Sequence, residues 1–132
     1  MHRCRVPIVD DDREAQELLR VALTADGYDV VAAADGRQAL YELRSRPETC
    51  VILLDLMLPV MDGEQFRAAQ RRDRSLAWIP VIVMSAAVDA DRAARELGAR
   101  RLVRKPLDLD DVRRALRAVG CAARPLGGLV TS

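Results

Sequence analysis

The chain has 132 residues, half of them hydrophobic, and its 21 Lys and Arg residues nearly balance its 20 Asp and Glu residues. This length fits one domain with a hydrophobic core, and the balanced charge does not favour nucleic acid as a partner. No apolar run approaches the ~20 residues needed to cross a bilayer, and the opening MHRCRVPIVDDD has charges where a secretory signal would be apolar. We therefore expect a cytoplasmic protein that binds neither nucleic acid nor a membrane.

Short aliphatic runs alternate with helical patterns in the first half of the chain. A run from about residue 6 leads into IVDDD, and the segment EAQELLRVALTADG has an apolar helical face and ends in glycine. The run YDVVAAA is followed by a helix start in which Asp35 stands three positions before Gln38, as in a capping box. CVILLD is the third run, and DGEQFRAAQRR is the third helix.

The second half repeats this alternation twice. IPVIVMSA is the fourth strand, with its proline near the beginning, where a missing N–H is tolerated. A helix follows from roughly residue 89 to 97, RRLVRKP supplies a short fifth strand, and Asp108 caps the last helix. One residue disagrees with this pattern: Pro7 lies inside the first strand and removes a hydrogen-bond donor. We expect that strand to begin late or to be distorted.

These five strand and helix pairs predict the fold class. Aliphatic strands without polar alternation are buried on both faces, and strands separated by helices run parallel through right-handed crossovers. The prediction is an α/β fold, a doubly wound five-stranded parallel sheet with helices on both faces. In such sheets, sites form beyond the carboxyl ends of the strands.

Polar residues stand at the ends of four predicted strands. Asp10 and Asp11 follow the first strand and Asp55 ends the third, while Ser85 and Lys105 follow the fourth and fifth. Because neighbouring strands lie about 4.8 Å apart, the three carboxylates should lie within a few ångströms and repel one another. Protonation of one carboxylate would relieve this repulsion, and so would Mg²⁺, which binds a few carboxylates and keeps waters for substrate oxygens.

With a metal bound, Asp55 could act as a carboxylate nucleophile toward a phosphoryl group. Lys105 would balance the phosphoryl oxygens and the Ser85 hydroxyl could donate to one of them. Taken singly, Ser85 suits a turn, Lys105 suits a solvated charge, and Asp12 resembles the N-cap of the next helix. The arginines of QRRDRS and RELGARRLVR are interpreted as solvated faces.

The segments IVDDD, LLDLMLPVMDG, VIVMSA and VRKP, in this order and at these spacings, resemble the receiver domain of two-component response regulators, the CheY-like module. The resemblance covers about residues 5 to 119, which makes residues 1–119 the receiver domain and residues 120–132 a flexible tail. It implies the flavodoxin-like strand order 2-1-3-4-5. It also implies that the bond between Lys105 and Pro106 is cis.

The resemblance further implies a chemical role for each strand-end residue. Asp55 would accept a phosphoryl group from a sensor histidine kinase or a phosphotransfer protein. Mg²⁺ would be bound by Asp10, Asp11, Asp55 and the backbone carbonyl of Met57, and Ser85 and Lys105 would read the phosphoryl group. The chain would then be a signalling domain and not an enzyme, apart from slow self-dephosphorylation.

The implied partners are proteins. A downstream protein would bind the face made by the fourth helix, fifth strand and fifth helix, and a weak homodimer is a further association to expect. Only GCAARPLGGLVTS follows residue 119, so we expect a stand-alone receiver whose output is protein binding.

Two departures from the family pattern affect that face. Leu102 occupies the position where the family usually has a Tyr or Phe switch, three residues before the lysine, and the span from Ser85 to Lys105 is short, which predicts a trimmed fourth helix. Leu102 favours an alternative, a degenerate receiver that binds partners without phosphorylation. An unrelated α/β enzyme is a weaker alternative, because GxGxxG and GxxxxGK[ST] are absent and Met57 stands where a phosphatase of this type would have a second acid.

Overall fold

The computed structural model describes residues 4–45 and 48–120, so residues 121–132 of the predicted tail lie outside the described part of the chain. Five strands and five helices alternate along the described residues. The strands are β1 (Arg5–Val9), β2 (Asp29–Ala33), β3 (Ile52–Asp55), β4 (Val81–Ser85) and β5 (Arg101–Arg104). The helices are α1 (Arg13–Ala25), α2 (Gly36–Ser45), α3 (Gly63–Arg72), α4 (Ala90–Glu96) and α5 (Leu109–Ala118).

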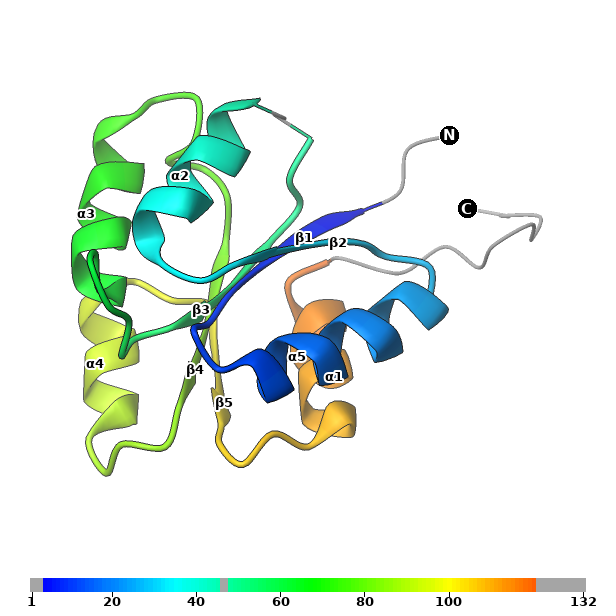
Figure 1. Cartoon of the computed structure of the whole chain (residues 1–132). Coiled ribbons are helices and arrows are strands. Elements are labelled where there is room, and N and C mark those ends of the chain that lie inside the picture. The colour runs from blue at the N-terminus through cyan, green and yellow to red at the C-terminus, as the bar shows by residue number, and fades with distance from the viewer. Residues whose placement is uncertain (1–3, 46–47, 121–132) are drawn as a thin grey trace.

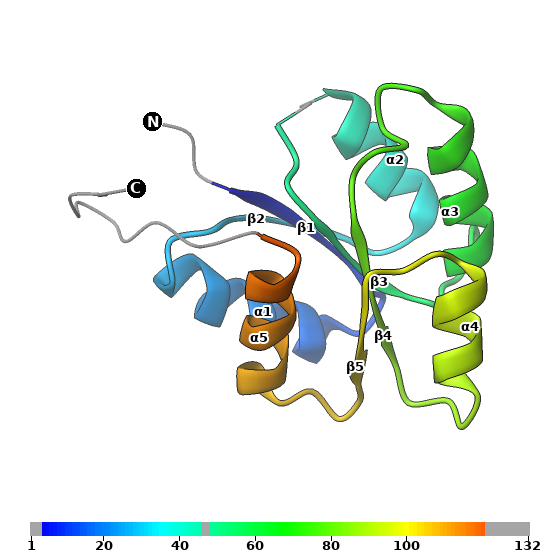
Figure 2. The same ribbon diagram turned by 180° about the vertical axis from the view of Figure 1, so that it is seen from behind.

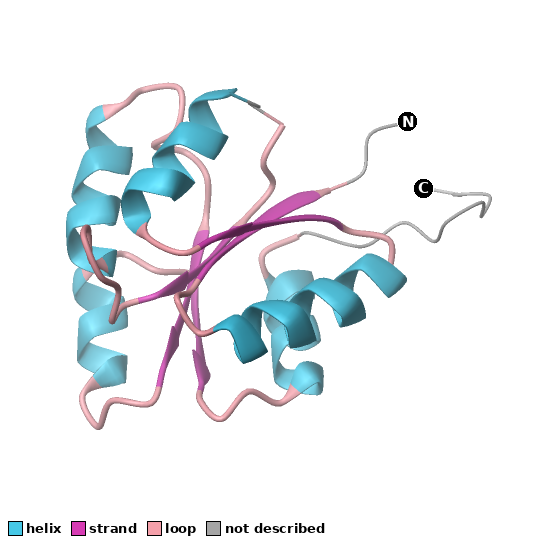
Figure 3. Cartoon of the chain, viewed as in Figure 1, coloured by secondary structure: helices cyan, strands magenta, loops and turns pink. Residues whose placement is uncertain are grey.

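The strands form one parallel sheet in the order β2-β1-β3-β4-β5. Helices α1 and α5 cover one face of the sheet, and α2, α3 and α4 cover the other, as the two opposite views show (Figures 1 and 2). The strands are therefore the middle of three layers (Figure 3). The predicted doubly wound sheet and its strand order are confirmed.

Alternate residues of the central strands face opposite sides of the sheet and build two cores. Leu53 and Ile82 belong to the core that includes Leu19 of α1 and Leu116 of α5. Their neighbours in the strands pack in a second core against residues of α2, α3 and α4, among them Leu40, Phe66 and Ala94. Burial on both faces explains why these strands are aliphatic without polar alternation. Within the described ranges, each helix is too short or too polar to span a bilayer.

Aspartates start several helices, as the sequence indicated. Asp12, Asp62 and Asp108 each accept a hydrogen bond from a backbone amide in the first turn of α1, α3 and α5. The capping interpretation of Asp12 is therefore confirmed. Helix α4 differs, because its N-cap Asp89 makes no side-chain capping bond and the helix has only seven residues. The expected short fourth helix is present.

Pro7 disturbs β1 on one side only. The register between β1 and β2 runs without a break from Arg5 through Pro7 to Val9, so the expectation of a late start was wrong on that side. Toward β3, continuous pairing covers only Ile8 and Val9, after the proline. The carbonyl of Arg5 faces the β3 side and accepts a hydrogen bond from the amide of Cys50. The backbone N–H and C=O groups of residues two apart in a strand face the same neighbour, so the position of the N–H that Pro7 lacks also faces β3.

A polar cluster, which we call the arginine cluster, joins α3 to the end of α4. It consists of the buried Arg67 and Gln70 and the exposed Arg71. Arg67 donates to the Leu97 carbonyl at 2.9 Å and to Gln70 Oε1 at 2.7 Å. Arg71 is exposed, as the sequence indicated, and it also donates to the Leu97 carbonyl, at 2.6 Å.

The amide of Gln70 completes this cluster. Its Nε2 donates to the carbonyls of Leu76 and Ile79, at 2.9 and 3.0 Å. Burial lowers the pKa of Arg67, and the nearby charge of Arg71 adds to the effect. The hydrogen bonds to carbonyl and amide oxygens keep this buried guanidinium satisfied.

Candidate functional site

The strand register brings the predicted site residues to one edge of the sheet in a stepwise arrangement. Asp55 pairs with Met84, so Ser85 lies one position beyond Asp55. Ser85 pairs with Arg104, so Lys105 lies one position beyond Ser85. The lysine must therefore reach back past β4 to contact groups on β3, and only a long side chain can do this.

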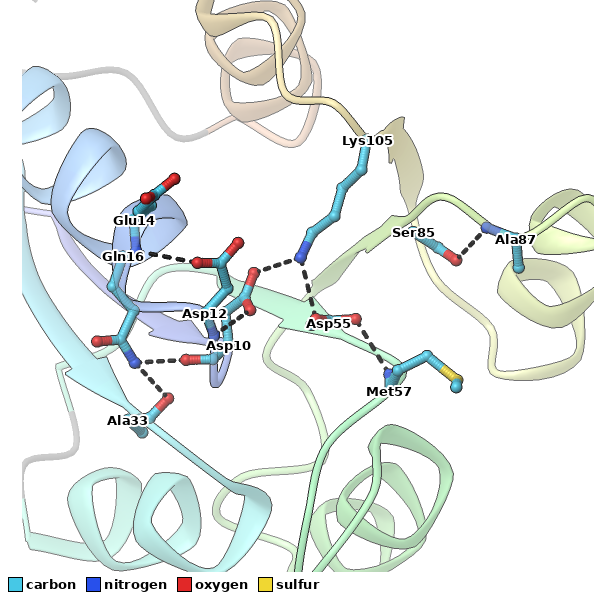
Figure 4. Close-up of polar contacts among 10 residues, drawn as sticks. All are labelled: Asp10, Asp12, Glu14, Gln16, Ala33, Asp55, Met57, Ser85, Ala87 and Lys105. Atoms are coloured by element: carbon cyan, nitrogen blue, oxygen red, sulfur yellow. Dashed lines mark hydrogen bonds and ion pairs between the residues drawn. The ribbon is translucent and has the colours of Figure 1, made fainter.

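Three carboxylates meet at this edge. Asp10, Asp11 and Asp55 each offer an oxygen, and these oxygens all lie within 4.8 Å of one another. Asp10 and Asp55 are buried, whereas Asp11 is exposed. Backbone amides orient the two buried groups: Asp12 N donates to Asp10 Oδ1 at 2.9 Å, and Met57 N donates to Asp55 Oδ1 at 3.0 Å (Figure 4). The predicted convergence of these carboxylates is present.

Lys105 lies between the two buried carboxylates. Its Nζ donates to Asp10 Oδ2 at 2.7 Å and to Asp55 Oδ2 at 3.0 Å (Figure 4). With Asp11 included, three carboxylates face one ammonium group. This acidic cluster, made of Asp10, Asp11, Asp55 and Lys105, therefore has an excess of negative charge.

The pKa directions follow from this crowding. Burial raises the pKa of Asp10, and the hydrogen bond from Lys105 opposes the shift without cancelling it. Burial alone would lower the pKa of Lys105, but its hydrogen bonds to Asp10 and Asp55 outweigh burial, so the pKa is raised. Lys105 is thus held as a cation, while Asp10 carries its charge at a cost that a second cation would reduce.

The donor set fits Mg²⁺. Hard divalent cations prefer carboxylate oxygens, and Mg²⁺ uses one or two carboxylates while it keeps several waters. Asp11 is the exposed member and leaves the cluster accessible from solvent. The Met57 amide donates to Asp55, which places Met57 beside the cluster, and a role for its carbonyl as a metal ligand stays a prediction.

Ser85 lies at the same edge but makes a different contact. Its hydroxyl accepts a hydrogen bond from the Ala87 amide at 3.1 Å and points toward that residue (Figure 4). Its carbonyl accepts from the Lys105 amide at 3.0 Å. Ser85 is therefore tied to the start of the lysine segment through its backbone, while its side chain holds the beginning of the β4–α4 connection.

Sequence reasoning missed one residue of this region. Gln16 in α1 donates through Nε2 to the backbone carbonyl of Asp10, and at 3.3 Å to the carbonyl of Ala33 (Figure 4). It therefore ties the first turns after β1 to the end of β2. Nothing in the sequence signals this contact, because Gln16 stands within an ordinary amphipathic helix, six positions after Asp10.

The model of the response regulator receiver domain family matches residues 6–117. The chain belongs to this family. The cis bond between Lys105 and Pro106, which the resemblance implied, is present in the structure. Receiver domains are signalling domains of two-component systems, so this coarse function is established for the receiver described here.

Known relatives and structures agree with this assignment. The receiver is 37% identical over 117 residues to the transcriptional regulatory protein TcrA of Mycobacterium tuberculosis, covering 87% of this chain and 45% of TcrA. The chain spans about half the length of the curated relatives it matches.

Two solved structures each cover about nine-tenths of the chain. The chemotaxis protein CheY4 of Vibrio cholerae superposes with a TM-score of 0.82 at 27% identity, over 89% of this chain and 99% of CheY4. The receiver domain of the histidine kinase PA1611 of Pseudomonas aeruginosa has a TM-score of 0.80 at 27% identity, over 90% of this chain and 99% of that domain. That PA1611 structure has a magnesium ion coordinated in its active-site cleft.

Proposed function

We propose that this receiver accepts a phosphoryl group on Asp55 from a histidine kinase or a phosphotransfer protein, in a reaction that depends on Mg²⁺. The supporting observation is the acidic cluster, in which oxygens of Asp10, Asp11 and Asp55 lie within 4.8 Å of one another beside Lys105. An excess of buried negative charge is unfavourable unless a ligand balances it. A cation and a phosphoryl group that bind together fit that requirement.

In the proposed reaction, a carboxylate oxygen of Asp55 forms a bond to phosphorus, and the bond from phosphorus to the donor's imidazole nitrogen breaks. The Met57 amide fixes the orientation of the Asp55 carboxylate. Lys105 exchanges a contact with Asp55 for one with a phosphoryl oxygen, and the Ser85 hydroxyl donates a hydrogen bond to another. Bound Mg²⁺ supplies the positive charge that offsets repulsion between the carboxylates and the phosphoryl oxygens.

We further propose that output occurs through the face of α4, β5 and α5. A groove of about 790 Å³ lies on this face. Its charged lining residues are Asp91, Arg101, Arg104, Asp111, Arg114 and Arg117. The excess of arginine over aspartate favours an acidic segment of a protein partner over a basic one.

The test is chemical modification of Asp55. Wild-type protein incubated with Mg²⁺ and a small phosphodonor should gain the mass of one phosphoryl group, and removal of Mg²⁺ by a chelator should prevent this. Asp55→Asn should gain nothing. Asp62→Asn is the matched control, because Asn caps a helix as well as Asp does and Asp62 is the N-cap of α3. An unmodified wild type, or an equal gain in Asp55→Asn, would refute the proposal.

A phosphorylation-independent binding module is the second candidate, and Leu102 is the observation that favours it. The side chain at this position packs beside the core of α2, α3 and α4 and offers no aromatic ring. Equal binding of a downstream partner by wild type and by Asp55→Asn, in the presence of phosphodonor, would support this candidate.

Further parts of the proposed function concern the cellular setting. We propose that the receiver works in the cytoplasm, that it has no catalytic activity beyond slow self-dephosphorylation, and that any homodimer is weak. Fractionation of its source cells tests the first point. The decay of the phosphorylated protein and its sedimentation behaviour test the others.

A further inference from the structure

The connection between β4 and α4 is held by polar contacts. Residues 86–89 are all exposed, and the Val88 side chain is 98% exposed. Asp89 does not cap α4 and instead pairs with Arg92 at 2.8 Å. Without an apolar anchor, this connection depends on a few hydrogen bonds for its position.

Arg104, the last residue of β5, supplies two of these contacts. Its Nη1 donates to the Ala87 carbonyl at 3.4 Å, and its Nη2 pairs with Asp91, in the first turn of α4, at 2.6 Å. The Ala87 amide in turn donates to the Ser85 hydroxyl at 3.1 Å (Figure 4). Arg104 therefore links Ser85, the connection and the start of α4 to the strand that precedes Lys105.

The other end of α4 is fixed. Arg67 and Arg71 both donate to the Leu97 carbonyl, just after the helix. Gly98 follows with a φ of +69°, and a side chain there would collide with the Arg71 guanidinium. Because the C-terminal end is anchored to α3 by two donors to one carbonyl, one of them the buried Arg67, a shift of α4 would occur at its N-terminal end, where the exposed Arg104 and Asp91 pair.

We propose that Arg104 is a positioning residue for Ser85, and that its ion pair with Asp91 opens when Asp55 is phosphorylated. The inference rests on the proposed function, in which the Ser85 hydroxyl turns to a phosphoryl oxygen. In turning, that hydroxyl leaves the Ala87 amide, and the connection that Arg104 holds through the Ala87 carbonyl is released. Since Leu102 has no ring to rotate, Arg104 carries the change to the groove, which both Arg104 and Asp91 line.

The size of the effect is limited by exposure. Solvent-exposed ion pairs contribute little to stability, and the loss of one changes an equilibrium constant by about two- to fivefold. Coupling between two sites is reciprocal. If phosphorylation opens the pair, then removing the pair strengthens binding of a phosphoryl analogue by the same factor.

The experiment is a double-mutant cycle read by binding of beryllofluoride in the presence of Mg²⁺, measured by calorimetry or by ¹⁹F NMR of the bound fluoride. Arg104→Ala and Asp91→Ala should each bind beryllofluoride about two- to fivefold more tightly than wild type. The double variant should bind no more tightly than either single variant, because all three lose the same pair. Arg104→Lys should restore part of the wild-type affinity.

Arg44→Ala is the matched control, because Arg44 also pairs with a distant aspartate, Asp73, at 3.5 Å on the surface. Its affinity should equal that of wild type. Hydrogen exchange should also be faster at the amides of residues 87–91 in Arg104→Ala, without a matching change at residues 97–99. Unchanged affinity in Arg104→Ala, or additive effects in the double variant, would overturn the inference. If wild type binds no beryllofluoride in an Asp55-dependent way, the proposed function itself fails.

Discussion

The acidic cluster and the arginine cluster both contain buried polar groups, but they differ in how well these groups are balanced by partners. In the arginine cluster, Arg67 donates to two backbone carbonyls and to Gln70, whose amide is also paired. In the acidic cluster, three carboxylates share one lysine, and Asp11 is open to solvent. A buried group that is satisfied within the chain stabilises the fold, whereas an unbalanced one costs stability and provides a binding site.

The largest effect expected from this comparison is on the arginine cluster. Arg67→Ala should lower the free energy of unfolding by about 3 kcal/mol, because it leaves the buried amide oxygen of Gln70 without its donor and removes one of the two donors to the Leu97 carbonyl. Urea denaturation measures this loss. Arg72→Ala, which removes an exposed neighbour on the same helix, should change stability by less than about 0.5 kcal/mol. Equal effects of the two substitutions would show that the buried contacts of Arg67 do not stabilise the fold.

The second effect concerns metal binding by the acidic cluster. Asp11→Asn should weaken Mg²⁺ binding on the order of tenfold, because the variant loses a charged oxygen ligand. Asp12→Asn is the control: Asp12 accepts from the Glu14 amide as the α1 N-cap, a role that Asn fills equally well. Calorimetric titration with Mg²⁺ measures both. Equal affinities in the two variants would remove Asp11 from the site.

The smallest effect is that of the Asp10 carboxylate on the stability of the fold in metal-free buffer. Because burial raises the pKa of Asp10, the folded protein binds this proton more tightly than the unfolded chain does. The ionised Asp10 therefore lowers the free energy of unfolding at neutral pH. This free energy rises again as the pH falls through the raised pKa of Asp10 and the carboxylate is protonated.

Asp10→Asn should accordingly be more stable than wild type by about 1 kcal/mol at neutral pH. The difference should shrink as the pH is lowered toward the ordinary range of an aspartate. Urea denaturation at several pH values measures this difference. A variant that is less stable than wild type at neutral pH would show that the bond to Lys105 outweighs the burial of the carboxylate.

The sequence predicted the layers and the site because both depend on short-range patterns. Aliphatic runs predicted the buried strands, and the residue at the end of each run predicted which side chains meet. Side-chain contacts between distant segments could not be read in this way. Arg67 reaches Leu97 and Arg104 reaches Asp91 across 30 and 13 positions, and their direction depends on packing. The side of β1 affected by Pro7 likewise depended on hydrogen-bond direction, which residue type alone does not determine.

The stepwise ending of β3, β4 and β5 has a consequence for insertions and deletions. Removing one residue from β5 would turn the following lysine toward the opposite side of the sheet, since side chains alternate along a strand. β4 and β5 pair with each other directly, so we expect removal of residues from α4 to leave their register unchanged. A change of length in α4 is therefore compatible with the contact between Lys105 and Asp55, whereas a change of length in β5 would abolish that contact. This is consistent with an α4 of only seven residues in a protein whose Lys105 still reaches Asp55.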